Sequence, residues 1–131
     1  MKSDSRGFTL VEILIVIVIV GILVSIVVPK FANGKERAMV TSMRGDLHNL
    51  LLAQEAYFSN AQDYYNGALP NPGVLPYSLS PGVAVVLSGV SSSGWGATAT
   101  HTGTPKSCAI FVGTAVPPAP ATIEGQIACT P

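Results

Sequence analysis

The pattern of hydrophobic and polar positions begins with a short polar leader, residues 1–7, followed by an almost unbroken apolar run over residues 13–28. Counted from Phe8, the apolar stretch is long enough to cross a bilayer, which takes about 20 mostly apolar residues. Its many Ile and Val side chains favour a strand in water. In lipid, however, a single span satisfies its backbone polar groups only as a helix. The pattern therefore predicts a membrane-spanning helix over residues 8–29.

After Pro29 the pattern becomes amphipathic. Apolar side chains recur close to every 3.6 residues from Met39 to Phe58, and Gln54 is the one polar member of this series. A helix with this pattern has one face suited to packing against a soluble domain. We therefore expect the helix to continue to about residue 58.

The remaining chain shows turn signals and then strand patterns. Residues 59–82 are rich in Asn, Gly and Pro and are expected to form a loop. Three predicted strands follow at 83–90, 94–102 and 107–113, and a fourth short piece at 122–129 returns to the sheet edge. The predicted fold is α+β, with one long N-terminal helix packed on a small antiparallel sheet of three or four strands.

Composition narrows the function classes. The 131 residues allow one small globular domain, so the predicted layout is a leader at 1–7, an apolar helix at 8–29 and a globular part at 30–131. Seven basic and seven acidic side chains balance, and no basic patch indicates nucleic acid. The sequence contains no phosphate loop, nucleophile motif or carboxylate cluster suited to calcium, and its two histidines are far apart. We predict no cofactor, no metal and no enzymatic activity.

One carboxylate, Glu12, interrupts the apolar segment. A charge at the bilayer centre costs roughly 2.5–3.5 kcal/mol, so an acid in such a segment indicates a function. The competing explanations are a secretory signal, a plain membrane anchor, and a first-turn acid favoured by the helix dipole. A secretory signal has a shorter apolar stretch with a small-residue cleavage site after it. Here the glycine that ends the leader, Gly7, comes before the run.

Gly21 and Pro29 are expected to loosen the helix. Proline removes a backbone donor and clashes with the carbonyl four residues earlier, and glycine weakens a helix by about 1 kcal/mol. The segment between them is therefore a predicted site of bending or local melting. Gly21 and Ser25 lie four residues apart and also suit close helix packing in a membrane, so both interpretations stay open.

The junction from Arg6 to Glu12 resembles the class III signal of type IV prepilins and the related pseudopilins. The shared features are a basic residue before glycine, the Phe-Thr-Leu-x-Glu pattern at residues 8–12, and an apolar helix that contains Gly21 and Pro29. The resemblance is close from Arg6 to Pro29. The rest of the chain is similar to pilins only in its layout.

This resemblance implies cleavage between Gly7 and Phe8 by a prepilin peptidase, which also N-methylates Phe8. It assigns Thr9 and Glu12 to assembly, with Glu12 neutralising the Phe8 amine of a neighbouring subunit. The residues alone leave an intrachain pair open, because after cleavage the Phe8 amine would lie four positions before Glu12 on the same helix face.

Two cysteines, Cys108 and Cys129, lie near the end of the sequence. An N-terminal export signal would place the globular part in an oxidising compartment, where disulfides persist. Metal binding requires more ligands than two cysteines and two distant histidines supply. We therefore predict a disulfide. For a loop of this size, the bridge would stabilise the folded domain by about 3 kcal/mol. The position also resembles the C-terminal disulfide-bounded region of type IV pilins.

The sequence thus predicts a type IV pilin-like subunit, held in the inner membrane and then packed by its apolar helix into an extracellular filament. The expected partners are other copies of the chain, the prepilin peptidase, the inner-membrane assembly machinery, and lipid before assembly. One alternative is a pseudopilin of a type II secretion system, which the missing acidic loop and the terminal cysteine pair disfavour. Another is a monomeric membrane-anchored domain that binds a ligand with its loops.

Overall fold

The computed structural model describes residues 7–131, so the predicted leader lies outside the described residues except for Gly7. The described chain divides into two parts, residues 7–35 and residues 36–131. The helix α1 spans Leu10–Ala61 and contributes to both parts, so each part is described by itself.

The ends of α1 differ by a few residues from the prediction of 8–58. The helix begins at Leu10 because Thr9 occupies the capping position before it. It ends at Ala61, where Gln62 takes a left-handed backbone conformation with a φ of 56° and donates its N–H to the Phe58 carbonyl at 2.8 Å. Glycine usually occupies this stop position, and a glutamine there gave no signal in the sequence.

The first part is a bare helix. Every described residue from 7 to 35 is exposed, and α1 remains helical through both Gly21 and Pro29. Within residues 7–131, α1 is the one helix with an apolar window long enough to cross a membrane, judged by length and composition. The apolar surface of this part is therefore not buried by any other residue of the described chain.

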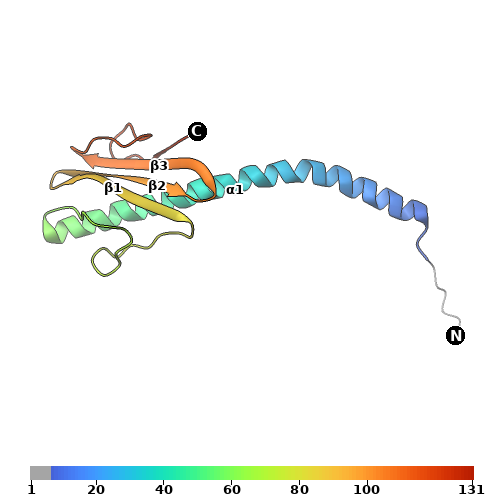
Figure 1. Ribbon diagram of the computed structural model, residues 1–131, viewed down its shortest axis with the longest axis horizontal. Helices are drawn as coiled ribbons and strands as arrows, with labels where there is room; N and C mark the ends of the chain where they lie inside the picture. The colour runs from blue at the N-terminus through green and yellow to red at the C-terminus, as the bar shows by residue number, and fades with distance from the viewer. Residues whose placement is uncertain (1–6) are drawn as a thin grey trace. The chain divides into compact units, whose positions relative to one another are not determined.

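The second part contains a four-stranded antiparallel sheet whose order follows the chain, β1-β2-β3-β4 (Figure 1). The fold class predicted from the sequence is confirmed. The strands are β1 at Val83–Ser91, β2 at Gly94–His101, β3 at Thr104–Gly113 and β4 at Ala128–Cys129.

Two strand predictions need correction. The strand β3 begins at Thr104, three residues before the predicted start, because His101 pairs with Thr104 across a tight β2–β3 turn. The strand β4 is only Ala128–Cys129, although 122–129 was predicted. Residues 122–127 do not form a ladder with β3, although Gly125 donates its N–H to the Phe111 carbonyl at 2.9 Å. Between β3 and these residues, Ala115 and Ala121 pack with Ala109 and Phe111.

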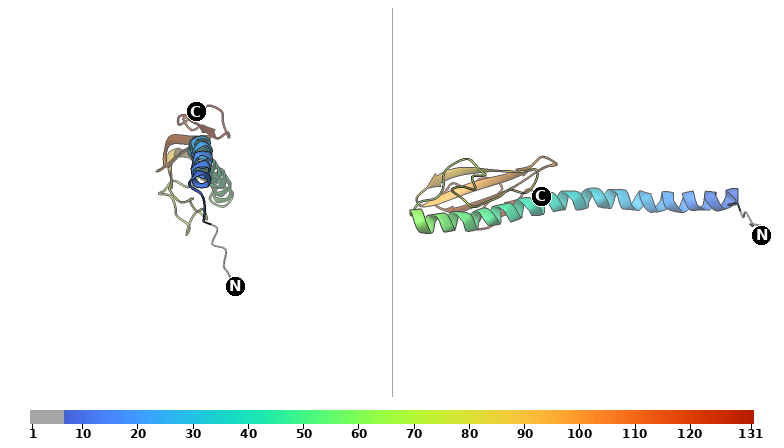
Figure 2. Two further views of the ribbon diagram at one scale, coloured as in Figure 1. Left: turned by 90° about the vertical axis from the view of Figure 1, so that its right-hand side faces the viewer. Right: turned by 90° about the horizontal axis from the view of Figure 1, so that it is seen from below.

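The core lies between the sheet and the C-terminal part of α1, drawn in green in Figure 2, where the sheet runs along one side of the helix. Met43, Leu47 and Leu50 on α1 are completely buried, as is Trp95 on β2. The remaining sheet positions that face the helix are mostly small, including Ala97 and Ala99. Small side chains on the central strand leave room for the large residues of the helix.

Candidate functional site

The start of α1 is a reciprocal hydrogen-bonded cap between Thr9 and Glu12. The Thr9 backbone N–H donates to Glu12 Oε2 at 2.7 Å, and the Thr9 hydroxyl donates to the same oxygen at 2.9 Å. In return, the Glu12 N–H donates to Thr9 Oγ1 at 3.3 Å. This is a capping box, which satisfies two backbone donors at a helix start.

This role of Thr9 and Glu12 was not predicted, although its signal is present in the sequence. A Thr-x-x-Glu pattern immediately before an apolar run predicts such a cap. The cap gives Glu12 a local partner that does not require cleavage of the leader. Both described bonds from Thr9 reach Oε2, and the structure shows no bond from residues 7–131 to Oε1. The second carboxylate oxygen therefore stays accessible.

Gly7 and Phe8 precede the helix in an exposed segment without regular secondary structure. Phe8 is 83% exposed, and a Cβ built on Gly7 would meet nothing within 4 Å. No contact among the described residues requires glycine at position 7. If glycine is required at position 7, the requirement would have to come from another molecule that recognises this peptide.

The apolar segment behind the cap carries the predicted bending positions. A Cβ built on Gly21 also meets nothing within 4 Å, and the Ser25 hydroxyl donates to the Ile22 carbonyl at 2.7 Å. Such a bond inside a helix satisfies a hydroxyl that would otherwise face lipid. Because α1 is helical at Gly21 and Pro29, bending or melting between them stays a prediction about another state of the chain.

The structure forms the disulfide between Cys108 and Cys129. The two residues face each other in the β3–β4 ladder. The edge continues with Thr130, whose N–H donates to the Ser107 carbonyl at 2.9 Å and whose Oγ1 accepts from the Ser107 N–H at 3.0 Å. The bridge therefore holds the short strand β4 against the sheet.

Two buried polar residues of α1 hold the long loop in place, and neither role was predicted. Gln54 is fully buried; its Oε1 accepts from the Tyr65 N–H at 2.9 Å and its Nε2 donates to the Tyr65 carbonyl at 3.0 Å. Asp46 accepts from the Ser80 N–H at 2.8 Å and from the Ser80 hydroxyl at 2.9 Å. A buried polar group is costly unless it is bonded, and the loop supplies the bonds.

Two tyrosines have shifted pKa values. Burial raises the pKa of the Tyr77 phenol well above its usual range, and the nearby Asp46 carboxylate adds to this shift. Burial also raises the pKa of Tyr64, with a further contribution from Glu55. Both shifts favour the neutral phenol, and neither residue lies beside a nucleophile motif.

The histidines do not form a site. His48 is exposed on α1, and His101 Nδ1 accepts from the Gly103 N–H at 2.9 Å in the β2–β3 turn. Within residues 7–131, no group of three or more His, Cys, Asp or Glu side chains is arranged to hold a metal ion.

Comparison with known proteins identifies the N-terminal segment. Residues 2–28 match the family described as the prokaryotic N-terminal methylation motif. The chain has a prepilin-type N-terminal segment. The resemblance inferred from the junction at Gly7 and Phe8 is thereby confirmed, and the prepilin-type segment contains the capping box and the exposed apolar helix described above.

Several curated proteins are similar to this chain. It is 38% identical to the type IV major pilin protein PilA of Myxococcus xanthus over 60 residues, which cover 46% of this chain and 27% of PilA. It is 43% identical to the type II secretion system core protein G of Pseudomonas aeruginosa over 56 residues, covering 43% and 39%. It is 38% identical to the type IV major fimbrial protein FimA of Dichelobacter nodosus over 55 residues, covering 42% and 35%.

The similarity is therefore concentrated in less than half of the molecule. The chain spans roughly a quarter to two fifths of the length of these relatives. The relatives include pilins and a secretion-system protein alike.

Proposed function

We propose that this chain is a structural subunit of a type IV pilus-like filament, polymerised through its N-terminal helix. The observation that carries the proposal is the helix of the prepilin-type segment, whose apolar residues are all exposed and whose first turn holds the single carboxylate Glu12. Exposed apolar surface of this extent requires cover by lipid or by other apolar helices. A filament core supplies the second kind of cover, and the membrane supplies the first before assembly.

Cleavage by a prepilin peptidase would create a cationic amine on Phe8, which can pair with the Glu12 carboxylate. Hydrolysis of the Gly7–Phe8 peptide bond leaves a carboxylate on Gly7 and a cationic amine on Phe8, which the enzyme then N-methylates. The exposed, unpacked peptide at Gly7 and Phe8 is accessible to such an enzyme. The absence of any steric need for glycine within the described chain supports a need imposed by the peptidase.

The same amine gives Glu12 a partner on a neighbouring subunit. Thr9 engages Oε2 of Glu12, which leaves Oε1 for the Phe8 amine of another copy. Removing one half of a buried ion pair costs about 3–5 kcal/mol because the remaining charge is left uncompensated. When two neighbouring apolar helices are displaced along their axes, the buried amine and carboxylate are left unpaired. This cost is avoided only at the axial offset that brings the Phe8 amine of one copy to the Glu12 carboxylate of the other. In this proposal, Thr9 orients the carboxylate and Glu12 sets the axial register.

Gly21 and Pro29 are proposed to let the apolar helix adapt to its neighbours. The proline lacks the N–H that would complete the helical ladder, and glycine weakens the helix by about 1 kcal/mol. Curvature or melting between them would adjust the packing of several parallel helices. The open space beside Gly21 equally permits close approach of a neighbouring helix.

We propose that the subunit is held in the inner membrane before assembly and is then incorporated into a filament at the cell surface. Its partners would be the prepilin peptidase, the assembly machinery of the inner membrane, and further copies of itself. The role is structural rather than enzymatic. The disulfide between Cys108 and Cys129 suits a domain exposed outside the reducing cytoplasm.

A second candidate is a pseudopilin of a type II secretion system. It is favoured by the 43% identity to core protein G of Pseudomonas aeruginosa. The terminal disulfide and the lack of a metal-binding carboxylate group among residues 7–131 favour the pilin. A monomeric membrane-anchored domain would use Glu12 only for its cap with Thr9 and would need no methylation motif, so the match of residues 2–28 counts against it.

The decisive experiment combines microscopy and mass spectrometry of filaments sheared from cells. We expect thin filaments whose main protein is this chain, beginning with N-methylated Phe8. Gly7→Val should leave an uncleaved precursor in the membrane, whereas the control Gly34→Ala, at a second open position, should be processed normally. A mature protein that begins beyond Val28 would indicate an ordinary signal peptide and would falsify the proposal. Filaments in which this chain is only a trace component would indicate a minor subunit.

A further inference from the structure

The basic side chains of the sheet domain gather in one place. Residues 36–131 contain three, Arg37, Arg44 and Lys106, and all three line a single cavity of about 400 Å³. Arg37 and Arg44 come from α1, and Lys106 comes from β3. The wall is completed by uncharged residues of α1 and by the chain around the disulfide, namely Val40, Thr41, Cys129, Thr130 and Pro131.

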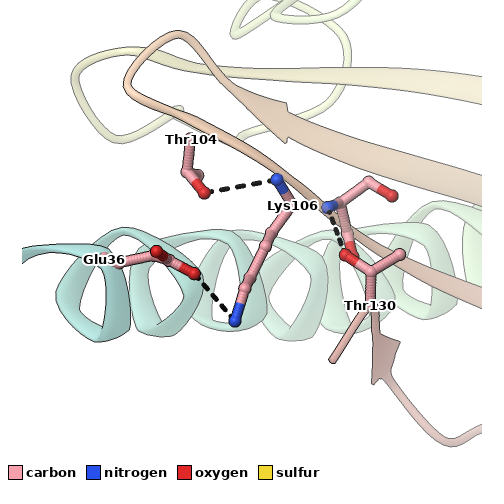
Figure 3. A network of polar contacts seen from close by, with 5 residues as sticks. Glu36, Thr104, Lys106 and Thr130 are labelled. Atoms are coloured by element: carbon pink, nitrogen blue, oxygen red, sulfur yellow. Dashed lines mark hydrogen bonds and ion pairs between the residues drawn. The ribbon is translucent and has the colours of Figure 1, made fainter. Parts of the chain in front are cut away.

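Two of the cations are held in position by the protein itself. Lys106 reaches from β3 to α1, where its Nζ lies 2.7 Å from Glu36 Oε1, and the backbone around it is held by Thr104 and Thr130 (Figure 3). Arg44 Nε donates to Cys129 Sγ at 3.2 Å. Glu36 pairs with Lys106, whereas Arg37 and Arg44 have no ion pair among residues 7–131, so two arginine charges in the cavity are not offset by a side chain.

The carboxylates that remain lie at the opposite end of the same domain. Glu55 accepts from the Tyr64 hydroxyl at 3.3 Å, and Asp63 follows the end of α1. Glu124 Oε1 accepts from the Gly113 N–H at 2.7 Å, at the end of β3 that is farthest from Lys106. Asp46, the other acid of this part, is buried against Ser80. We call Glu55, Asp63 and Glu124 the acidic end.

The two charged ends cannot neutralise each other within one molecule. Arg44 and Glu55 are the nearest such pair along α1, and at 1.5 Å per residue their backbones lie about 16 Å apart. This separation exceeds the Debye length of about 8 Å at physiological ionic strength. Each end is therefore available to a charged partner.

We propose that the basic cavity receives the acidic end of a second copy of this chain. The inference rests on the proposed function, because a filament is where copies meet in a repeated head-to-tail order. A contact between two different surfaces of identical subunits is heterologous and propagates without closing into a dimer. The occupant is argued from complementarity, since the same domain gathers all its cations at one end and its free carboxylates at the other.

The test exchanges charges between the two ends. Arg37→Glu alters a cation that has no described ion pair, and Glu55→Lys alters an exposed acid on the same helix. Asn49→Glu and Asn49→Lys are the matched controls, because Asn49 is exposed on α1 between the two ends. Filaments are counted by microscopy at equal levels of the folded, disulfide-bonded subunit.

Each single exchange should reduce filament number several-fold relative to the Asn49 controls, because it places like charges together where position 37 of one copy meets position 55 of the next. Co-expression of the two variants should restore filaments, since positions 37 and 55 carry opposite charges at every contact between the two kinds of subunit. A variant that merely misfolds would not be rescued by a second one. The double variant, in which the charges at positions 37 and 55 are exchanged, should also assemble.

Normal filaments from both single variants would overturn the contact while leaving the proposed function intact. The same holds if co-expression restores nothing. If Arg37→Glu assembles normally but loses binding to vesicles of anionic phospholipid, the cavity serves lipid headgroups and the inference is wrong. A wild-type chain that forms no filaments at all would remove the proposed function and this contact together.

Discussion

The two parts of the molecule obey opposite rules of burial. Every described residue from 7 to 35 is exposed, although most of its side chains are apolar. In residues 36–131 a core of apolar side chains is buried between helix and sheet, and the buried polar residues Asp46 and Gln54 are hydrogen-bonded. The sequence of the second part is thus explained by contacts within the chain. The sequence of the first part is explained only by molecules outside it.

This difference teaches where a substitution should act. A change in the first part leaves the sheet domain unaltered and acts on insertion, processing or assembly. A change in the core of the second part alters the free energy of unfolding and acts on assembly through the amount of folded subunit. Each of the following predictions tests this division.

The largest expected effect comes from Glu12→Gln. Glutamine also forms a capping box with a preceding Thr, so this variant keeps the helix start and removes only the charge. We expect cleaved, membrane-bound subunits at normal levels and almost no filaments, because the Phe8 amine of each neighbour loses its partner. Subunit levels are measured by immunoblotting and filaments by microscopy.

Thr9→Ala is the complementary control for Glu12→Gln. It removes the hydroxyl of the cap at a cost of about 1 kcal/mol to the helix start and keeps the carboxylate. Filaments should therefore persist in reduced number. Normal filament numbers with Glu12→Gln would show that charge pairing does not set the register.

Leu47→Ala and Ile17→Ala form a matched pair across the two parts. Leu47 is fully buried, and such truncations cost about 2–5 kcal/mol. Ile17 is 61% exposed, so its truncation should leave the unfolding of the sheet domain unchanged. Thermal unfolding of the full chain in detergent, followed by near-ultraviolet circular dichroism of Trp95, measures both. Equal losses in the two variants would contradict the division.

Cys108→Ser should reduce stability by about 3 kcal/mol, because the open chain regains the entropy that the bridge removes. The same variant should lower filament yield in proportion to the loss of folded subunit. Denaturant unfolding of wild type with and without reductant provides the reference. If a thiol reagent labels both cysteines in the native, unreduced protein, the bridge is absent in cells.

The smallest effect concerns alkaline pH. Burial raises the pKa of Tyr77 in the folded domain, so above about pH 10, the ordinary pKa of tyrosine, the unfolded chain loses its phenolic proton while the folded domain retains it. Stability is complete below this pH and falls as the pH rises toward the folded-state pKa. Tyr77→Phe should change stability at pH 7 by less than about 1 kcal/mol and flatten the alkaline loss. An unchanged alkaline slope, measured by denaturant unfolding from pH 8 to 11, would assign the loss to other groups.

Local patterns were enough to predict much of this molecule. The membrane-grade run, the helical period from Met39 to Phe58 and the turn-bounded strands each depend on neighbouring residues, and the α+β fold followed from them. The predicted strands β1 and β2 agree with the structure to within one residue at each end. The capping box of Thr9 and Glu12 was equally local, so it was within reach of the sequence although it was missed.

The features set by hydrophobic period and by short motifs could be predicted from the sequence: the long helix, the positions of the strands along the chain and the junction at Gly7 and Phe8. Only the tertiary structure decided which distant groups meet. Gln54 bonds the backbone of Tyr65, Asp46 bonds Ser80, and Ala115 and Ala121 pack with Ala109 and Phe111 of β3. The tertiary structure also separated the basic cavity from the acidic end. These contacts form where the chain folds back on the helix, between residues that are far apart in the sequence. The local spacing of side chains does not indicate which of these residues meet.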